Sequence, residues 1–96
     1  MAEYYLSQKA DDDLTSCFRY GVENFGLDRA VQYLHAMHDK FALLAENPNV
    51  GRDASELAPR MRSFRQGSHV VFYQSDNTGV LIARVLRKEM DFKQHI

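Results

Sequence analysis

Apolar residues recur at helical spacing through the first half of the chain, and this pattern constrains the fold more than any other feature. One stripe runs through residues 9–25 at intervals of three or four positions, which predicts a helix with one apolar face. Ser7 stands where it can cap the first turn, and Gly26 stands where a helix commonly ends. The stripe consists of Ala10, Leu14, Cys17, Gly21 and Phe25.

A second apolar stripe follows almost at once and predicts a helix over residues 29–46, with Asp28 as its N-cap and Asn47-Pro48 at its end. So short a connection between two helices makes an antiparallel helical hairpin. The stripe consists of Val31, Leu34, His38, Phe41 and Ala45, and Ala30, Met37 and Leu44 widen it.

The second half of the chain has the pattern of strands separated by turns, and Ser75–Gly79 is the strongest turn signal. The order β-α-α-β-β-β predicts one α+β domain over residues 1–96, in which an antiparallel sheet packs one face against the helical hairpin. The other face of the sheet is expected to be open, and the tail over residues 87–96 has no clear pattern. The predicted strands cover residues 3–6, 61–66, 69–73 and 80–86.

Length and composition narrow the class of protein. With 96 residues, of which 45% are hydrophobic, the chain can bury one modest core. It contains no apolar run of about 18 residues, so no transmembrane helix is expected, and its N-terminus does not resemble a signal peptide. Cys17 is the only cysteine and cannot form an internal disulfide, which favours a reducing cytoplasm.

The charges are distributed unevenly along the chain. Residues 1–59 carry five lysines and arginines against ten acids, whereas residues 60–96 carry seven against three. A basic second half indicates an anionic partner, such as nucleic acid, the ribosome or an acidic protein segment. The alternative is that these charges only solvate two surfaces.

Arg84 lies between Ala83 and Val85 in an otherwise apolar strand. Burying an unpaired charge costs several kcal/mol, so the guanidinium must reach water or an acceptor. Strand alternation places Arg84 on the face of Ile82 and Leu86. It would therefore either meet phosphate or carboxylate in a concave site, or pair with a local acid such as Asp91 or Glu89.

Catalysis without a metal would need groups that transfer protons and groups that stabilise negative charge. His69, Tyr73 and His95 could transfer protons and the arginines could supply charge, but the spacing does not require this role. No metal site is expected, because Asp11–Asp13 point in different directions on a helix and no third ligand accompanies the histidines of the second helix. No cofactor motif is present.

Several segments, in order along the chain, resemble ParE-type toxins of the ParE/RelE toxin–antitoxin superfamily. Each segment is weakly specific alone, but together they span essentially the whole sequence. They are Tyr5-Leu-Ser7, Ala10–Leu14, Leu44–Arg52, Arg62–Tyr73, Arg84–Asp91 and His95-Ile96.

The resemblance implies a RelE-like fold, no cofactor, and a cognate ParD-like antitoxin from the same operon. The antitoxin would dock a helix and add a strand, covering an apolar strip on the helical hairpin. ParE relatives poison DNA gyrase, so gyrase is the implied target, with no membrane association and no sequence-specific nucleic-acid binding. We expect antitoxin contacts at Leu34, Met37, Phe41, Phe64 and Tyr73, and target contacts at Arg62, Arg65, Arg84, Arg87, Lys88, Met90 and His95.

RelE relatives instead cut messenger RNA on the ribosome, and this is the alternative function. Three positions depart from the RelE pattern: Ala54–Pro59 contains no lysine, Val70 replaces an arginine, and Gln94-His95 stands where a tyrosine is expected. A ribonuclease would have to be built from His69, Arg84 and His95. The departures favour gyrase inhibition.

Overall fold

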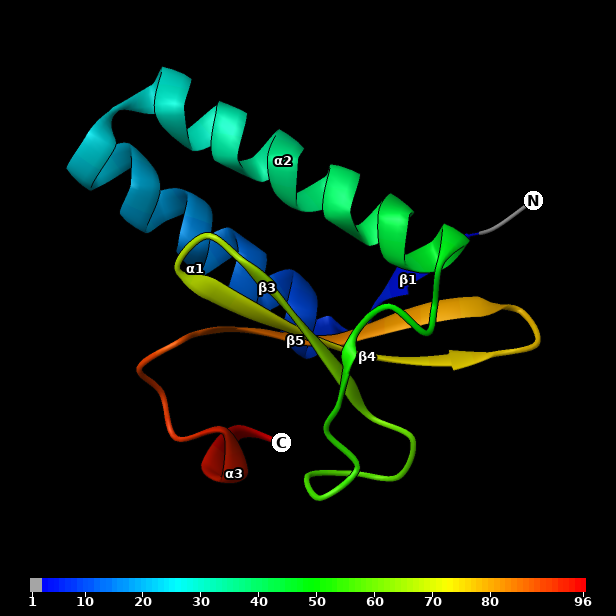
Figure 1. The fold of residues 1–96 in the computed structure, drawn as a ribbon. Helices are drawn as coiled ribbons and strands as arrows, with labels where there is room; N and C mark the ends of the chain where they lie inside the picture. Colours follow the sequence, from blue (N-terminus) through cyan, green and yellow to red (C-terminus); the bar gives the residue numbers. More distant parts are fainter. Residues whose placement is uncertain (1–2) are drawn as a thin grey trace.

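The computed structural model describes residues 3–96, in which a helical hairpin packs on one face of a five-stranded sheet (Figure 1). The predicted β-α-α-β-β-β order is confirmed, with a two-residue strand and a short C-terminal helix added. The elements are β1 (Tyr4–Leu6), α1 (Gln8–Phe25), α2 (Leu27–Glu46), β2 (Arg52–Asp53), β3 (Arg62–Gln66), β4 (His69–Asp76), β5 (Gly79–Arg87) and α3 (Phe92–His95).

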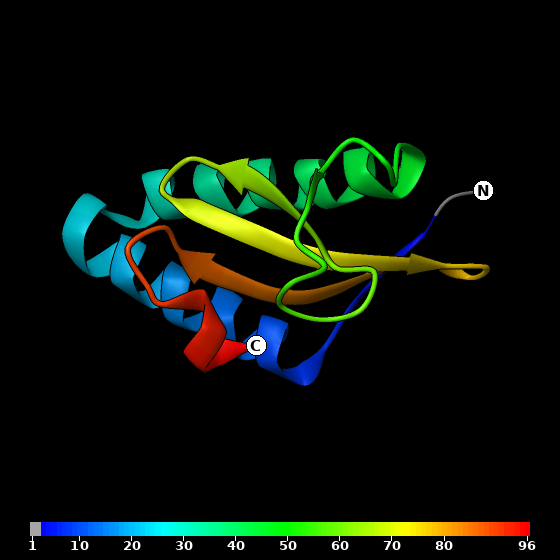
Figure 2. The same cartoon turned by 60° about the horizontal axis from the view of Figure 1, so that its bottom comes forward.

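The strands follow one another across the sheet in the order β1-β5-β4-β3-β2. Strands β2 to β5 form an antiparallel series, as predicted, but β1 pairs with β5 in parallel, so the sheet is mixed. The two helices form the crossover that separates β1 from the other strands in sequence, and both lie over the same face of the sheet (Figure 2).

The helix ends follow from local capping. The Ser7 side chain accepts a hydrogen bond from the Ala10 amide at 3.0 Å, which confirms Ser7 as the N-cap of α1. Gly26, with φ of 92°, alone separates the two helices. The prediction that Asp28 caps α2 is wrong, because α2 begins at Leu27 and places Asp28 inside its first turn.

Two apolar clusters lie on opposite faces of the sheet. The larger one fills the space between the hairpin and the sheet and includes Met37, Phe41 and Tyr73, none of which is exposed. The second is built on Phe72 and Leu86, and the loop after β2 and the C-terminal tail cover it. The expectation of an open second face is therefore wrong, because this cluster already occupies it.

A bulge in β5 changes which face Arg84 occupies. Phe72 of β4 pairs with Arg84 whereas Tyr73 pairs with Ile82, which leaves Ala83 as the extra residue. An inserted residue moves the following side chains to the opposite face. Arg84 therefore shares a face with Leu86, as predicted, but not with Ile82, which belongs to the core under the helices.

Asp13 of α1 joins the helical layer to β5. Its carboxylate accepts hydrogen bonds from Arg84 Nε at 2.8 Å, from Arg84 Nη2 at 2.9 Å and from the Val85 amide at 2.9 Å. Arg84 also donates to the carbonyl of His95, which ties the C-terminal tail to the same point. The predicted acid partners, Asp91 and Glu89, are wrong, because Asp13 lies closer in the fold although 71 residues away in sequence.

Tyr73 fixes the loop that follows α2. Its hydroxyl donates to the Pro48 carbonyl at 2.9 Å and accepts from the Gly51 amide at 2.8 Å. A Cβ at position 51 would lie only 2.3 Å from this hydroxyl, so the close approach requires glycine. Within residues 3–96, no helix is both long and apolar enough to cross a membrane.

Replacing Asp13 with alanine should lower the free energy of unfolding by about 3 kcal/mol, because it leaves the Arg84 guanidinium, only 15% exposed, without its partner. Asp12→Ala, on the exposed side of α1, should change it by less than about 0.5 kcal/mol. Urea denaturation of both variants measures the difference. Equal effects of the two changes would contradict the role given to Asp13.

Tyr73→Phe should lower the free energy of unfolding by about 1–3 kcal/mol, because the buried Gly51 amide loses its acceptor. Tyr5→Phe is the matched control, since Tyr5 is 46% exposed. Thermal melts followed by circular dichroism test both. A Tyr73→Phe protein as stable as the control would show that this hydroxyl does not hold the loop.

Candidate functional site

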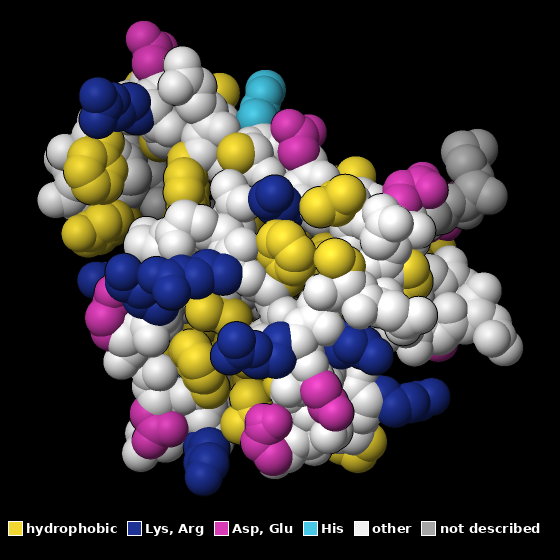
Figure 3. Space-filling view, viewed as in Figure 1, with side chains coloured by type: hydrophobic (Ala, Val, Ile, Leu, Met, Phe, Trp, Pro, Cys, Tyr) yellow, Lys and Arg dark blue, Asp and Glu magenta, His cyan; other side chains and the backbone are white. Residues whose placement is uncertain are grey.

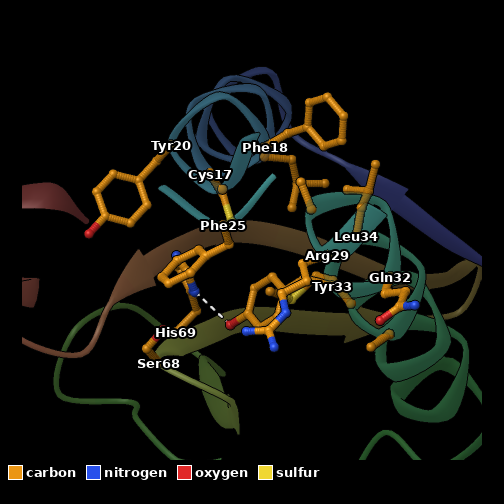
Figure 4. A pocket seen from close by; sticks show the side chains of 15 residues that line it. Cys17, Phe18, Tyr20, Phe25, Arg29, Gln32, Tyr33, Leu34, Ser68 and His69 are labelled. Carbon is orange, nitrogen blue, oxygen red and sulfur yellow. Dashed lines mark hydrogen bonds between the residues drawn. The ribbon is translucent and has the colours of Figure 1, made fainter. Parts of the chain in front are cut away.

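A groove of about 570 Å³ opens between the two helices near their connection and ends at the β3–β4 turn (Figure 4). It exists because the apolar stripe of α1 is only partly covered. Ala10 and Leu14 are buried, Cys17 and Gly21 are half-buried, and Phe25 is 59% exposed. The part of the predicted stripe that the sheet does not cover becomes one wall of the groove.

Aromatic and aliphatic side chains from both helices dominate the lining of this groove. The polar groups are few and come mainly from α2, from the β3–β4 turn and from the start of β4. Such a surface suits a partner with one apolar face, anchored by a small number of polar contacts. The lining residues that carry the argument are Phe18, Phe25, Leu34, Met37, Arg29 and His69.

His69 and Tyr33 close one end of the groove. The Tyr33 hydroxyl donates to the Gln66 carbonyl at 2.9 Å and lies 2.7 Å from His69 Nδ1 (Figure 4). Because the only hydroxyl proton goes to Gln66, Nδ1 must donate to the Tyr33 oxygen. Burial, followed by the charge of Arg87, lowers the pKa of His69 below its ordinary value.

Tyr33 was missed as a site residue, although the sequence held a signal for it. It lies three residues after Ala30 and four before Met37, which are both buried on α2. The helical spacing therefore places Tyr33 at the edge of the apolar face. Gly67 allows the approach of its ring, because a Cβ there would lie 2.7 Å from the Tyr33 hydroxyl.

Exposed apolar side chains surround the connection between the helices. Phe25 and Leu27 are each 59% exposed, Tyr20 is 49% exposed and Val31 is 37% exposed. Hydrophobic side chains gather at this end of the hairpin in Figure 3, where lysine and arginine side chains lie below them. A patch of this kind, continuous with a groove, is typical of a protein-binding surface.

The residues predicted to contact an antitoxin fall into different places. Leu34 is half-buried and lines the groove. Met37 lies beneath the groove, but it has no exposed surface and could contact a partner only if the side chains above it moved. Phe41 and Tyr73 have no exposed surface, so these two predictions are wrong for the domain as folded. Phe64 packs at the edge of the main core, with Lys40 5.4 Å from the centre of its ring.

The residues predicted to contact the target do not form one set. Arg62 donates to the Gly51 carbonyl and Arg84 is held by Asp13, so both have structural partners. Met90 packs in the second apolar cluster, and His95 is half-buried with its carbonyl bound to Arg84. The side chains left exposed are Arg65, Arg87 and Lys88.

The three residues considered for a ribonuclease are not assembled into a proton-transfer site. Among residues 3–96, no hydrogen bond joins His69 to Arg84 or His95. Asp13 raises the pKa of Arg84 further, so this side chain is a fixed cation with a structural partner. The same part of the chain contains no cluster of three or more histidine, cysteine or acidic side chains that could hold a metal ion.

Comparisons with known proteins agree with the resemblance. Residues 4–92 match the family described as the ParE toxin of the type II toxin-antitoxin system parDE. Toxin ParE1 of Caulobacter vibrioides is 32% identical over 96 residues, covering 100% of this chain and 99% of that toxin. Toxin ParE1 of Mycobacterium tuberculosis is 31% identical, covering 99% and 98%.

A solved structure shares the fold. It is described as the chromosomal ParDE TA system from P. aeruginosa, and it superposes with a TM-score of 0.77 at 19% sequence identity. The superposition covers 93% of this chain and 98% of the matched chain. The helical hairpin, the mixed sheet and the family match over nearly the whole sequence lead to one assignment: the chain belongs to the ParE toxin family of type II toxin–antitoxin systems.

Proposed function

We propose that this protein is the toxin of a toxin–antitoxin pair, that it acts on DNA gyrase, and that a ParD-like antitoxin neutralises it by filling the groove between α1 and α2. The observation that carries the proposal is the family match over residues 4–92. Inhibition of gyrase in turn blocks replication, and such a toxin would act in the cytoplasm.

The antitoxin part of the proposal is supported by the shape and chemistry of the groove. A chain with a similar fold belongs to a ParDE system from P. aeruginosa, and the name of that system pairs a toxin with an antitoxin. An amphipathic helix binds by placing apolar side chains in such a groove. Phe25 and Leu34 lie on opposite helices and both face this space, so they would contact the same segment of antitoxin.

Gyrase inhibition is favoured over RNA cleavage because side chains that cleavage would need are already held in structural contacts. Arg84 is engaged by Asp13, and the Tyr73 hydroxyl is buried against the Pro48 and Gly51 backbone. Neither can approach a phosphate without breaking these contacts. A binding inhibitor needs no proton-transfer site, and Arg65, Arg87 and Lys88 remain exposed for contact with an acidic surface.

Purified protein added to gyrase, ATP and plasmid should reduce supercoiling and yield linear DNA after protease treatment, in proportion to the toxin added. An excess of the antitoxin encoded in the same operon should abolish both effects. Agarose gels of the plasmid products score the result. Supercoiling that proceeds normally with folded toxin would rule out gyrase, and cleavage of messenger RNA on ribosomes would then be tested with His69→Ala and His95→Ala variants.

Phe25→Ala should weaken antitoxin binding by about tenfold, because it removes an exposed aromatic anchor from the groove wall. Val50→Ala is the control, since Val50 is 52% exposed and does not line the groove. Isothermal titration calorimetry with the operon's antitoxin gives both dissociation constants. Equal affinities for the two variants would place the antitoxin elsewhere on the toxin.

A further inference from the structure

The groove differs in charge from the helices that form it. Helices α1 and α2 together carry seven acidic residues and four lysines and arginines. None of the 15 side chains that line the groove is a carboxylate, whereas Arg29 and His69 are among them. The acids of both helices therefore lie outside the groove.

One further cation, Arg87, borders the groove from the end of β5. The Arg87 guanidinium carbon lies 5.3 Å from the centre of the Tyr20 ring, which forms part of the lining. Glu89 approaches Arg87 only at 3.7 Å, and both side chains are more than half exposed. An ion pair of this kind is weak and screened, so Arg87 stays available to an incoming carboxylate.

His69 presents a second polar atom to the groove. Its Nδ1 is committed to Tyr33, but its Nε2 makes no hydrogen bond with any residue between 3 and 96. No buried polar side-chain atom in this part of the chain lacks a partner, so Nε2 is accessible to solvent, and His69 is one of the residues that line the groove. The neutral ring offers an acceptor there, and the protonated ring offers a charged donor.

We propose that the antitoxin segment in this groove is an amphipathic helix whose edges carry acidic side chains, which meet Arg29, Arg87 and His69. This inference rests on the proposed function, since it concerns the same groove. Apolar side chains on the lining would supply most of the affinity, and the three basic groups would select an acidic segment over a neutral or basic one.

This arrangement predicts in which direction the affinity for the antitoxin changes with pH. His69 faces Tyr33 on α2, Cys17 and Asp13 on α1, and Arg87 and Glu89 at the end of β5. Its pKa is lowered in the free toxin, so the ring is neutral at pH 7. A carboxylate placed beside it raises the pKa, so binding takes up a proton and the affinity rises as the pH falls from above the pKa of the bound ring to below that of the free ring.

The test compares charge variants in calorimetric titrations with the operon's antitoxin. Arg29→Gln and Arg87→Gln should each raise the dissociation constant roughly 2- to 5-fold and reduce its salt dependence. Arg19→Gln, an exposed cation of α1 outside the groove, should change neither. An antitoxin whose acids in the toxin-binding segment are changed to amides should bind wild type and Arg29→Gln equally.

The same titrations at several pH values test His69. Wild-type toxin should bind more tightly as pH falls, and His69→Gln should lose most of this slope, because glutamine does not titrate. Thermal melts establish that each variant is folded. The inference would be overturned if the affinity of the wild type decreased as the pH was lowered and that of His69→Gln did not. Such a result would mean that an apolar group, rather than a carboxylate, covers the ring.

The outcomes separate this inference from the proposed function. If Phe25→Ala weakens binding but the charge variants and the amide antitoxin do not, the groove holds the antitoxin and the acidic requirement is wrong. If Phe25→Ala binds like Val50→Ala, the antitoxin lies elsewhere and both the groove assignment and the inference fail. Tight binding that depends on Arg29 and Arg87 but not on Arg19 supports both.

Discussion

The Asp13 carboxylate is the contact on which the rest of the structure depends. It neutralises Arg84 and accepts a hydrogen bond from the Val85 amide. Val85 lies in the part of β5 that continues past the residues paired with β1. Because Arg84 also holds the His95 carbonyl, one group connects the helical layer, the sheet and the C-terminal tail. The arginine that was a candidate for target or substrate binding therefore has a structural role in holding these three parts together.

Those surfaces arise from incomplete coverage of the helices. The hairpin is longer than the core beneath it, so the first half of the α1 stripe is buried while the end near Phe25 is exposed beside a groove. The second face of the sheet is closed by the loop after β2 and by the tail. The small domain thus keeps a large apolar recess beside the exposed end of the hairpin.

Local patterns predicted the helical hairpin, four of the five strands and the Ser7 cap, because spacing and capping act over a few residues. The Asp13–Arg84 pair, the bulge at Ala83 and the burial of Tyr73 could not be predicted, because each depends on residues brought together only by the fold. Phe41 and Phe25 illustrate the same limit for the site. Both lie on apolar stripes, but the sheet covers Phe41 and leaves Phe25 exposed.

The placement of Asp13 also has a consequence for the edge of β5. Beyond the pairing with β1, β5 would present an unpaired edge on which a strand from another chain could form. The carboxylate takes the Val85 amide that such a strand would use, and it places a negative charge at the same point. At this point the edge of β5 is therefore closed to pairing with a strand from another chain.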